Sequence, residues 1–402
     1  MSETVSQPQP WLRRMSGRDP GERHRASTPL ELLFDLTFVV AVARAAAELH
    51  HALAEGHVAH ALLGYVMIFF GIWWAWMNFT WFASAYDTDD VPYRLLTLVQ
   101  MAGVLVFAAG IPAAFDHYDF TTVVIGYVIM RMALVAQWLR AAREHPEGRS
   151  ATLRYAAGVA AVQVCWIARL WLPGLWGLIG FAMLVLAELA VPVWAEFAGR
   201  MTSWHPGHIT ERYGLFTIIV LGEVVAAATT AVQSALTAGR LSPALLTAAV
   251  GGLLLVFAVW WSYFKHSAAE QIAQSLRSAL VWGYGHYVVF ASVAALGAGL
   301  QVVVDALAHS SHVTPMFAAF TVAVPVTVFL VVLALLNARM SANQPVATRP
   351  VMVAALLVLL SALATRLVAL PLTIMIIALL VVVLLVYHMA DMHKIIRRRT
   401  ST

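Results

Sequence analysis

The sequence has little charge and almost no cysteine, and both shortages narrow the class of protein. Only 11% of its 402 residues are charged, whereas 61% are hydrophobic, and the mean hydropathy is +0.78. Because so little polar surface cannot cover a soluble globule of this length, we expect an integral membrane protein. The single cysteine, Cys165, excludes an intrachain disulfide and a cysteine-based metal site.

Signatures of several soluble enzyme classes are also missing. The sequence contains no Gly-rich phosphate loop, no nucleophile elbow, no zincin motif and no convincing pair of haem-ligating histidines. These absences argue against ATP hydrolysis and proteolysis, and they predict neither a cofactor nor a resident metal ion. Basic residues form no stripe with interleaved aromatics, which argues against a nucleic-acid partner. Residues 1–28 are polar and Arg-rich without an apolar core, so no cleavable signal is expected there.

Long apolar runs are what the sequence does contain. Each has about 20 residues, the length that crosses a hydrocarbon core. The predicted spans are residues 29–50, 60–84, 93–114, 120–141, 152–172, 174–198, 208–232, 244–266, 277–303, 313–337, 348–367 and 369–390. We therefore expect an all-α polytopic membrane protein in contact with membrane lipids.

Positive charges are distributed unevenly over the segments between these spans. If both termini are cytoplasmic, the inner segments hold 20 of the 25 Lys and Arg residues and the outer hairpins hold three. The remaining two, Arg44 and Arg131, lie within spans. Such an asymmetry favours an even number of spans with both termini in the cytoplasm.

The two halves of the chain share features in the same order. Four pairs carry this correspondence: Glu31-x5-Thr37 with Glu211-x5-Thr217, Trp73-Trp74 with Trp260-Trp261, Arg94 with Arg277, and the proline hairpin Arg169-Leu-Trp-Leu-Pro173 with Arg366-Leu-Val-Ala-Leu-Pro371. We interpret it as duplication of a six-span unit, with repeats at 29–198 and 199–390 between an Arg-rich segment 1–28 and a basic tail 391–402. Because six is even, the repeats should be parallel. The alternative is that such features recur in any membrane protein.

Two acids lie one helical turn apart in the first span. Glu31 follows Ser27, Thr28 and Pro29, a typical helix start where the dipole favours acids, so it is readily interpreted as a first-turn acid. Asp35 lies about 9 Å further in. We expect Asp35 to be a buried ion pair, a proton site or a cation site.

The two intramembrane arginines require acidic partners. Arg131, near the middle of the fourth span, has Asp35, Glu31 and Glu188 as candidates, and both a structural ion pair and a transport role fit it. Arg44 has two options. Glu48 lies four residues further along the same helix, whereas the repeat alignment places Glu223 beside Arg44 across the pseudo-twofold axis.

Glu223 and several histidines complete the candidate residues. Glu223 lies about 20 Å along its span without a cation nearby on its own helix, which makes it a candidate proton or substrate site. Gly222 before it leaves room for close helix contact or a ligand. His208 and Glu211 could share a helical face, but two ligands are too few for a metal site, and a polar entry turn is the simpler interpretation. His286 is a candidate for lining a polar cavity.

Tryptophans crowd the second predicted span. Trp73, Trp74, Trp76 and Trp81 exceed what an interfacial belt requires. Core packing is the first interpretation, and an aromatic-lined ligand cavity is the second.

Two segments resemble the bacterial low temperature requirement protein A family. They are Glu31-Leu-Leu-Phe-Asp35-Leu-Thr-Phe-Val-Val and His208-Ile-Thr-Glu211-Arg212-Tyr213-Gly-Leu-Phe-Thr-Ile-Ile-Val-Leu-Gly222-Glu223. The resemblance implies a multi-pass protein of the bacterial inner membrane, linked by name to growth in the cold. It implies no biochemical activity.

Three functions fit these observations. The leading one is a transporter or permease-like protein for an unknown small molecule or ion, coupled to protons through Asp35 and Glu223. The alternative is a membrane-embedded enzyme acting on an apolar or lipid-like substrate, with the acids and His208 or His286 as acid and base. The third is a structural accessory protein for growth in the cold. Assembly into a homo-oligomer is open in each case.

Overall fold

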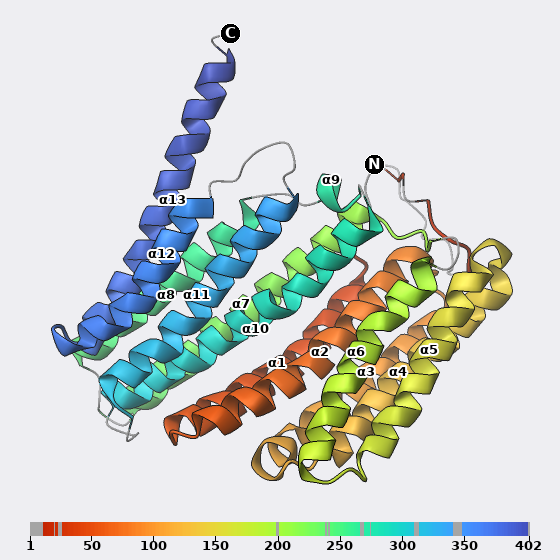
Figure 1. Cartoon of the computed structure of the whole chain (residues 1–402), viewed down its shortest axis with the longest axis horizontal. Coiled ribbons are helices and arrows are strands. Elements are labelled where there is room, and N and C mark those ends of the chain that lie inside the picture. Colours follow the sequence, from red (N-terminus) through yellow and green to blue (C-terminus); the bar gives the residue numbers. More distant parts are fainter. Residues whose placement is uncertain are drawn as a thin grey trace, which may run out of the picture. The chain divides into compact units, whose positions relative to one another are not determined.

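The structure is a computed structural model, and all regular secondary structure in the part of the chain that it describes is helical (Figure 1). It describes residues 11–19, 21–22, 26–197, 201–237, 239, 242–265, 269–273, 275–308, 313–340 and 348–400. The side chains of the predicted basic tail 391–402 lie outside the described part, as do residues 1–10, 20 and 23–25 of the predicted N-terminal segment.

Twelve long helices account for most of these residues. They are α1 (Pro29–Ala54), α2 (Val58–Tyr86), α3 (Val91–His117), α4 (Thr121–Glu144), α5 (Arg149–Arg169), α6 (Gly174–Phe197), α7 (Pro206–Thr237), α8 (Pro243–Phe264), α10 (Leu276–Leu307), α11 (Pro315–Met340), α12 (Thr348–Ser361) and α13 (Leu370–Thr400). Three short elements complete the set: α9 (Ala269–Ile272), η1 (Pro146–Gly148) and η2 (Ala362–Arg366). The helices follow the twelve predicted spans.

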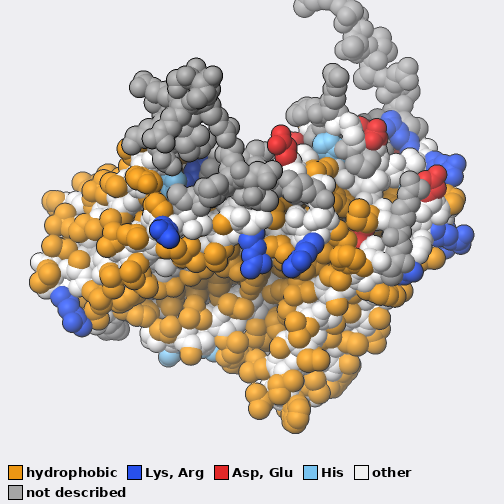
Figure 2. Space-filling view, turned by 45° about the horizontal axis from the view of Figure 1, so that its top comes forward, with side chains coloured by type: hydrophobic (Ala, Val, Ile, Leu, Met, Phe, Trp, Pro, Cys, Tyr) orange, Lys and Arg blue, Asp and Glu red, His pale blue; other side chains and the backbone are white. Residues whose placement is uncertain are grey.

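Eleven helices in the described part are long and apolar enough to cross a membrane. Hydrophobic side chains accordingly cover most of the visible surface in Figure 2. The helix α1 forms as predicted but falls outside this set, because it carries the charged residues Glu31, Asp35, Arg44 and Glu48. Both predicted proline hairpins join spanning helices: α5 to α6 beside Pro173, and the α12–η2 stretch to α13 beside Pro371.

The chain divides into two compact units. Unit 1 comprises Met1–Ala41 and Gly71–Arg212, and unit 2 comprises Val42–Phe70 and Tyr213–Thr402. The helices α1, α2 and α7 therefore contribute one part to each unit. This division does not coincide with the proposed repeat boundary after residue 198, and the repeat stays a prediction.

In unit 1, successive helices pack side by side in the order α3, α4, α5, α6. Helices α3 and α4 approach most closely at glycines. A Cβ atom added to Gly126 would lie 2.3 Å from the backbone nitrogen of Phe107 and 2.6 Å from the carbonyl oxygen of Gly103. Only glycine permits this backbone approach, which is typical of membrane helix pairs.

The end of this bundle is bound by an N-terminal segment of residues 11–18. The backbone N–H of Arg13 donates to Asp90 Oδ2 over 2.8 Å, and that of Arg18 donates to the carbonyl oxygen of Ala85 over 3.1 Å. Arg140 of α4 donates to both carboxylate oxygens of Asp90 and to Glu144. The segment is thereby fixed to the ends of α2, α3 and α4.

In unit 2, the order α10, α11, α12, α13 is similar, and α8 packs against α13. The α10 to α11 contact is again close, because a Cβ atom on Gly299 would lie 2.1 Å from the carbonyl oxygen of Thr321. The part of α2 that belongs to unit 2 contacts α10, since Tyr65 Oη donates to the carbonyl oxygen of Ala291 over 2.7 Å.

Candidate functional site

Glu31 closes the first turn of α1, as the sequence predicts. The backbone N–H of Thr28 donates to Glu31 Oε2 over 2.8 Å, and the N–H of Glu31 donates to Thr28 Oγ1 over 3.2 Å. This reciprocal arrangement is a capping box, with Pro29 at the first helical position. The cap uses the Oε2 atom of Glu31, so the partners of Oε1 must come from other parts of the chain.

The second oxygen of Glu31 faces α7. Glu31 Oε1 lies 3.2 Å from His208 Nε2 and 3.1 Å from Arg212 Nη1. Asp35, one turn further along α1, accepts from Arg212 Nη2 over 2.5 Å and from Arg212 Nε over 3.2 Å, a forked geometry that fixes the guanidinium. Trp76 Nε1 of α2 also donates to Asp35, over 2.7 Å. We call Glu31, Asp35, His208 and Arg212 the acid–arginine cluster.

Helical spacing builds this cluster from two matched pairs. Glu31 and Asp35 are four residues apart on α1, and His208 and Arg212 are four residues apart on α7, so each pair shares one helix face. All four side chains are completely buried, and all four belong to unit 1. The site is therefore held by two regular helices rather than by loops.

The acid–arginine cluster combines acidic, basic and imidazole side chains. Among its four members, two carboxylates and one histidine share a single guanidinium. Buried charges are costly unless they are paired, so the charge of each member depends on the others.

Beside this cluster, the start of α7 is capped by His205 rather than arranged around a metal ion. The Nδ1 atom of His205 accepts from the backbone N–H of His208 over 3.1 Å. Glu211, which the sequence groups with His208, instead accepts from the backbone N–H of Ser27 over 3.1 Å. No group of three His, Cys, Asp or Glu residues in the described chain is placed to hold a metal ion.

Arg131 pairs with Glu188, one of its three predicted partners. Arg131 Nη2 of α4 lies 3.0 Å from Glu188 Oε2 of α6, and both side chains are buried. Four further donors surround this carboxylate: Trp74 Nε1, Tyr127 Oη, Gln163 Nε2 and Trp166 Nε1, at 2.7 to 3.2 Å. One cation faces one anion whose oxygens are saturated, which is the geometry of a structural ion pair.

Two tryptophans of α2 connect the charged groups of unit 1. Trp74 donates to Glu188, and Trp76, on the other side of the helix, donates to Asp35. Both indoles are fully buried. The crowded tryptophans are thus packed in the core, as predicted, and they also satisfy buried carboxylates.

The predicted charges of the outer halves of α1 and α7 form no pair. Glu223 is half-buried and Arg44 is exposed, and neither has an ion-pair partner among the described residues. The pairs of Arg44 with Glu48 and with Glu223 are therefore not formed in this part of the chain. A Cβ atom added to Gly222 would meet nothing within 4 Å, so this glycine does not serve close helix contact within the chain.

His286 lies in the aromatic core of unit 2. Its Nε2 lies 3.1 Å from Tyr263 Oη, and its Nδ1 lies 2.7 Å from the carbonyl oxygen of Trp282. The rings of Tyr213 and Phe290 pack around it. The histidine is thus fully packed and hydrogen-bonded instead of lining a polar cavity.

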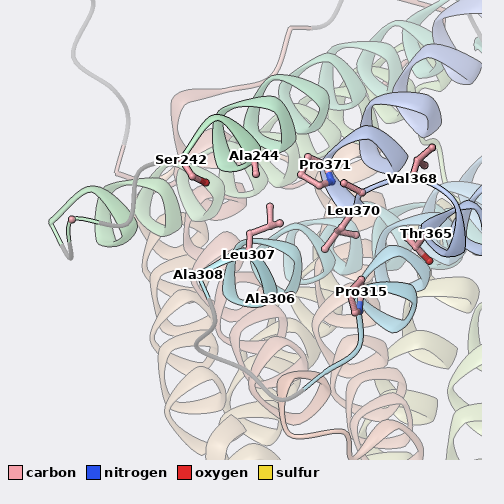
Figure 3. A pocket seen from close by; sticks show the side chains of 12 residues that line it. Ser242, Ala244, Ala306, Leu307, Ala308, Pro315, Thr365, Val368, Leu370 and Pro371 are labelled. Atoms are coloured by element: carbon pink, nitrogen blue, oxygen red, sulfur yellow. The ribbon is translucent and has the colours of Figure 1, made fainter.

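Unit 2 also contains a cavity, shown in Figure 3, which encloses about 790 Å³. It lies where α7 and α8, α10 and α11, and α12 and α13 are joined. Its lining is mostly apolar: Gly239, Ser242, Ala244, Ala306, Leu307, Ala308, Pro315, Thr365, Val368, Ala369, Leu370 and Pro371. None of the candidate proton, substrate or ion-pair residues from the sequence lines it.

Comparison with known proteins agrees with the two sequence motifs. The family model described as bacterial low temperature requirement A protein matches residues 26–387. The chain belongs to this family. The matched region includes every helix that forms the acid–arginine cluster. A curated protein from Rhizobium meliloti (strain 1021), whose name states no function, is 28% identical to this chain over 297 residues, covering 69% of this chain and 68% of that protein.

Sequence reasoning missed Arg212, the central cation of the cluster. It counted Arg212 among the cytoplasmic topology charges, although the side chain is completely buried. The available signal was its position four residues after His208, which repeats the spacing of Glu31 and Asp35. Trp76 as a donor to Asp35 had no sequence signal beyond the crowding of tryptophans.

Proposed function

We propose that this family member is a permease-like protein of the bacterial inner membrane whose conformational change is coupled to a proton held by the acid–arginine cluster. The supporting observation is that Glu31 and Asp35 share the guanidinium of Arg212 in a completely buried site that also holds His208. Intramembrane ionisable groups with this arrangement mark proton relays in pumps and transporters. Glu31 thus takes the place that the sequence assigned to Glu223 as the partner of Asp35.

Loss of the proton would alter the contact between α1 and α7 in unit 1. Glu31 and Asp35 lie on one helix face, and like charges at this spacing repel each other. From α7, Arg212 contacts both acids and His208 contacts Glu31. Proton release therefore weakens one helix contact, and this coupling is what a proton-driven conformational change requires.

The proposal includes a parallel duplication with both termini in the cytoplasm. In unit 1 the neighbour order is α3, α4, α5, α6, and in unit 2 it is α10, α11, α12, α13, which are the corresponding predicted spans. Close backbone contacts occur in the first hairpin of each series, at Gly126 and at Gly299. The excess of basic residues in the predicted inner segments supports the orientation.

A membrane-embedded enzyme remains the alternative function. It called for Glu223, Asp35 and a histidine around a cavity that holds a lipid. Asp35 and His208 belong to one cluster, in which Asp35 contacts Arg212 and His208 contacts Glu31. The cavity of Figure 3, however, is lined by neither Asp35 nor His208 nor Glu223. No observation therefore favours the enzyme over the permease.

Proton flux through reconstituted protein tests the proposal. Vesicles carry a pH-sensitive dye, and a potassium diffusion potential drives protons inward, with the lumen either empty or loaded with a low-molecular-mass extract of the bacterium. We expect the wild type to exceed protein-free vesicles in at least one condition. Glu31→Gln should reduce the excess flux by roughly tenfold or more, because it removes one of the two carboxyl groups that hold the exchangeable proton in this proposal.

The matched control is Glu270→Gln, the same substitution on the exposed short helix α9. This variant should retain wild-type flux. Wild-type flux no higher than that of protein-free vesicles in both conditions, or full flux through Glu31→Gln, would overturn the proposal.

A further inference from the structure

Arg44 and Glu223 are opposite charges without an ion-pair partner among the described residues. Both belong to unit 2, and neither has an ion-pair partner in the part of the chain that the structure describes. Leu36, Val40 and Arg44 follow one another at four-residue intervals along α1. Leu36 is 53% exposed and Val40 is 43% exposed, so Arg44 continues a lipid-facing stripe. A guanidinium in such a stripe calls for an acidic partner from outside the chain.

Contacts with α10 place the two charges at similar depth. Val224 of α7 packs against Gly297, and His50 of α1 lies 2.7 Å from Asp305. The helix α7 runs parallel to α10, since Tyr213 meets Trp282 and Phe216 meets Phe290. The helix α1 is also parallel to α10, because α2, its hairpin partner, runs antiparallel to α10 through Tyr65 with Ala291 and Phe70 with Tyr287.

Counting residues at 1.5 Å each along these parallel helices puts Arg44 and Glu223 within about 5 Å of one depth. A twofold axis along the membrane normal preserves depth. Arg44 of one copy can therefore reach the level of Glu223 in a second copy, and the reverse pair forms at the same time.

The exposed face of α7 beyond Glu223 is more polar than the exposed stripe of α13. From Gly222 outward its exposed positions include Thr229, Thr230, Gln233 and Ser234. The exposed stripe of α13 in the same unit is aliphatic by contrast, with Leu372, Leu379 and Val383 between 47% and 64% exposed. An amide and a carboxylate on α7 suit a protein partner that supplies hydrogen bonds and a cation.

We propose that the chain forms a twofold homodimer through the outer halves of α1 and α7, in which Arg44 of each copy pairs with Glu223 of the other. The occupant of the polar α7 face is thus a second copy of this chain. Charge complementarity decides this choice, because the chain itself presents both the unpaired anion and the unpaired cation. The dimer is independent of the proton proposal, whose residues all lie in unit 1.

Disulfide trapping tests the contact in the full-length protein. Arg44→Cys and Glu223→Cys are placed on separately tagged chains, both with Cys165→Ser, and the two chains are co-expressed in membranes. The mixed dimer keeps one natural Arg44 with Glu223 pair, so the design preserves half of the interface. We expect a disulfide between the two tags. Val383→Cys, on the aliphatic face of α13, replaces either partner as the control and should give none.

Charge exchange supplies a second, independent test. Arg44→Glu alone and Glu223→Arg alone place like charges together, so each should raise the dimer dissociation constant by about tenfold or more, and the combined exchange should recover most of the loss. Light scattering of protein in lipid nanodiscs gives the mass. Three outcomes would each overturn the proposal. They are a monomeric wild type, a disulfide that forms only with the Val383→Cys control, and a combined variant whose dimer dissociation constant does not recover.

Discussion

The two units bury very different interiors. In unit 1 the buried side chains include Glu31, Asp35, Arg131, Glu188 and Arg212, whereas the buried polar residues of unit 2 include no Asp, Glu, Lys or Arg among those described. The most polar buried group of unit 2 is His286, enclosed by aromatic rings. Burying charge costs more than burying apolar groups, so unit 1 carries a cost that unit 2 avoids.

Within unit 1, the two buried charge groups also differ from each other. Arg131 and Glu188 balance, and every carboxylate oxygen is satisfied. The acid–arginine cluster instead places two carboxylates and a histidine around one guanidinium. The comparison teaches that burial alone does not indicate function, because one group is a single ion pair whereas in the other several ionisable side chains share one cation.

The largest expected effect comes from removing one member of the balanced pair. Arg131→Met leaves Glu188 buried without its cation and should destabilise the protein by about 3–5 kcal/mol. In unit 2, His286→Phe loses only hydrogen bonds between neutral groups and should cost about 1 kcal/mol. Reversible unfolding of the protein in bicelles, followed by circular dichroism, measures both values.

The combined change of Arg131→Met with Glu188→Met controls for the loss of packing. It should recover most of the stability, because no unpaired charge remains. Equal losses for Arg131→Met and His286→Phe would contradict the contrast between the units.

A smaller effect should be shared by both units. Gly126→Ala and Gly299→Ala insert a methyl group where backbone atoms already lie within 2.3 Å and 2.1 Å of the added atom. Each should cost about 1–3 kcal/mol, since the helices must separate. Gly222→Ala, where the added atom meets nothing within 4 Å, should leave the stability of the single chain unchanged or higher. If only one of the two buried variants is destabilised, the hairpins are not equivalent.

The smallest effect concerns pH and is confined to unit 1. Burial would raise the pKa of Asp90, but hydrogen bonds from Arg140 and from the backbone N–H groups of Arg13 and Tyr93 lower it to about 2. Because the folded pKa lies below the unfolded value, ionised Asp90 stabilises the fold at pH values above about 4 and loses this contribution as the pH falls toward about 2.

Replacing the Asp90 carboxylate should therefore lower the stability of the fold mainly at pH values above about 4. Asp90→Asn should lower stability by about 1–2 kcal/mol at neutral pH and by much less near pH 2–3. Unfolding midpoints of the wild type and the variant across this pH range measure the difference. A gap that stays constant with pH would show that the carboxylate charge does not anchor the N-terminal segment.

Much of the fold could be predicted because it depends on local properties. The length of each apolar run predicts a helix, and the helix starting at Pro29 carries its own cap in Thr28 and Glu31. The partner of Arg131 was narrowed to three acids because an intramembrane guanidinium has few options. The sequence did not indicate that Arg212 is buried, because a basic residue near a helix start equally fits the excess of basic residues in cytoplasmic segments.

The sequence by itself determined the class of protein, the family and the positions of the helices, because the length of an apolar run and a short motif are local properties of the sequence. The tertiary structure alone decided which charges meet. Arg212 joins Glu31 and Asp35, whereas Glu223 and Arg44 find no partner among the described residues. The physical reason is that a buried charge is stabilised by groups on other helices, and their approach depends on how helices far apart in sequence pack.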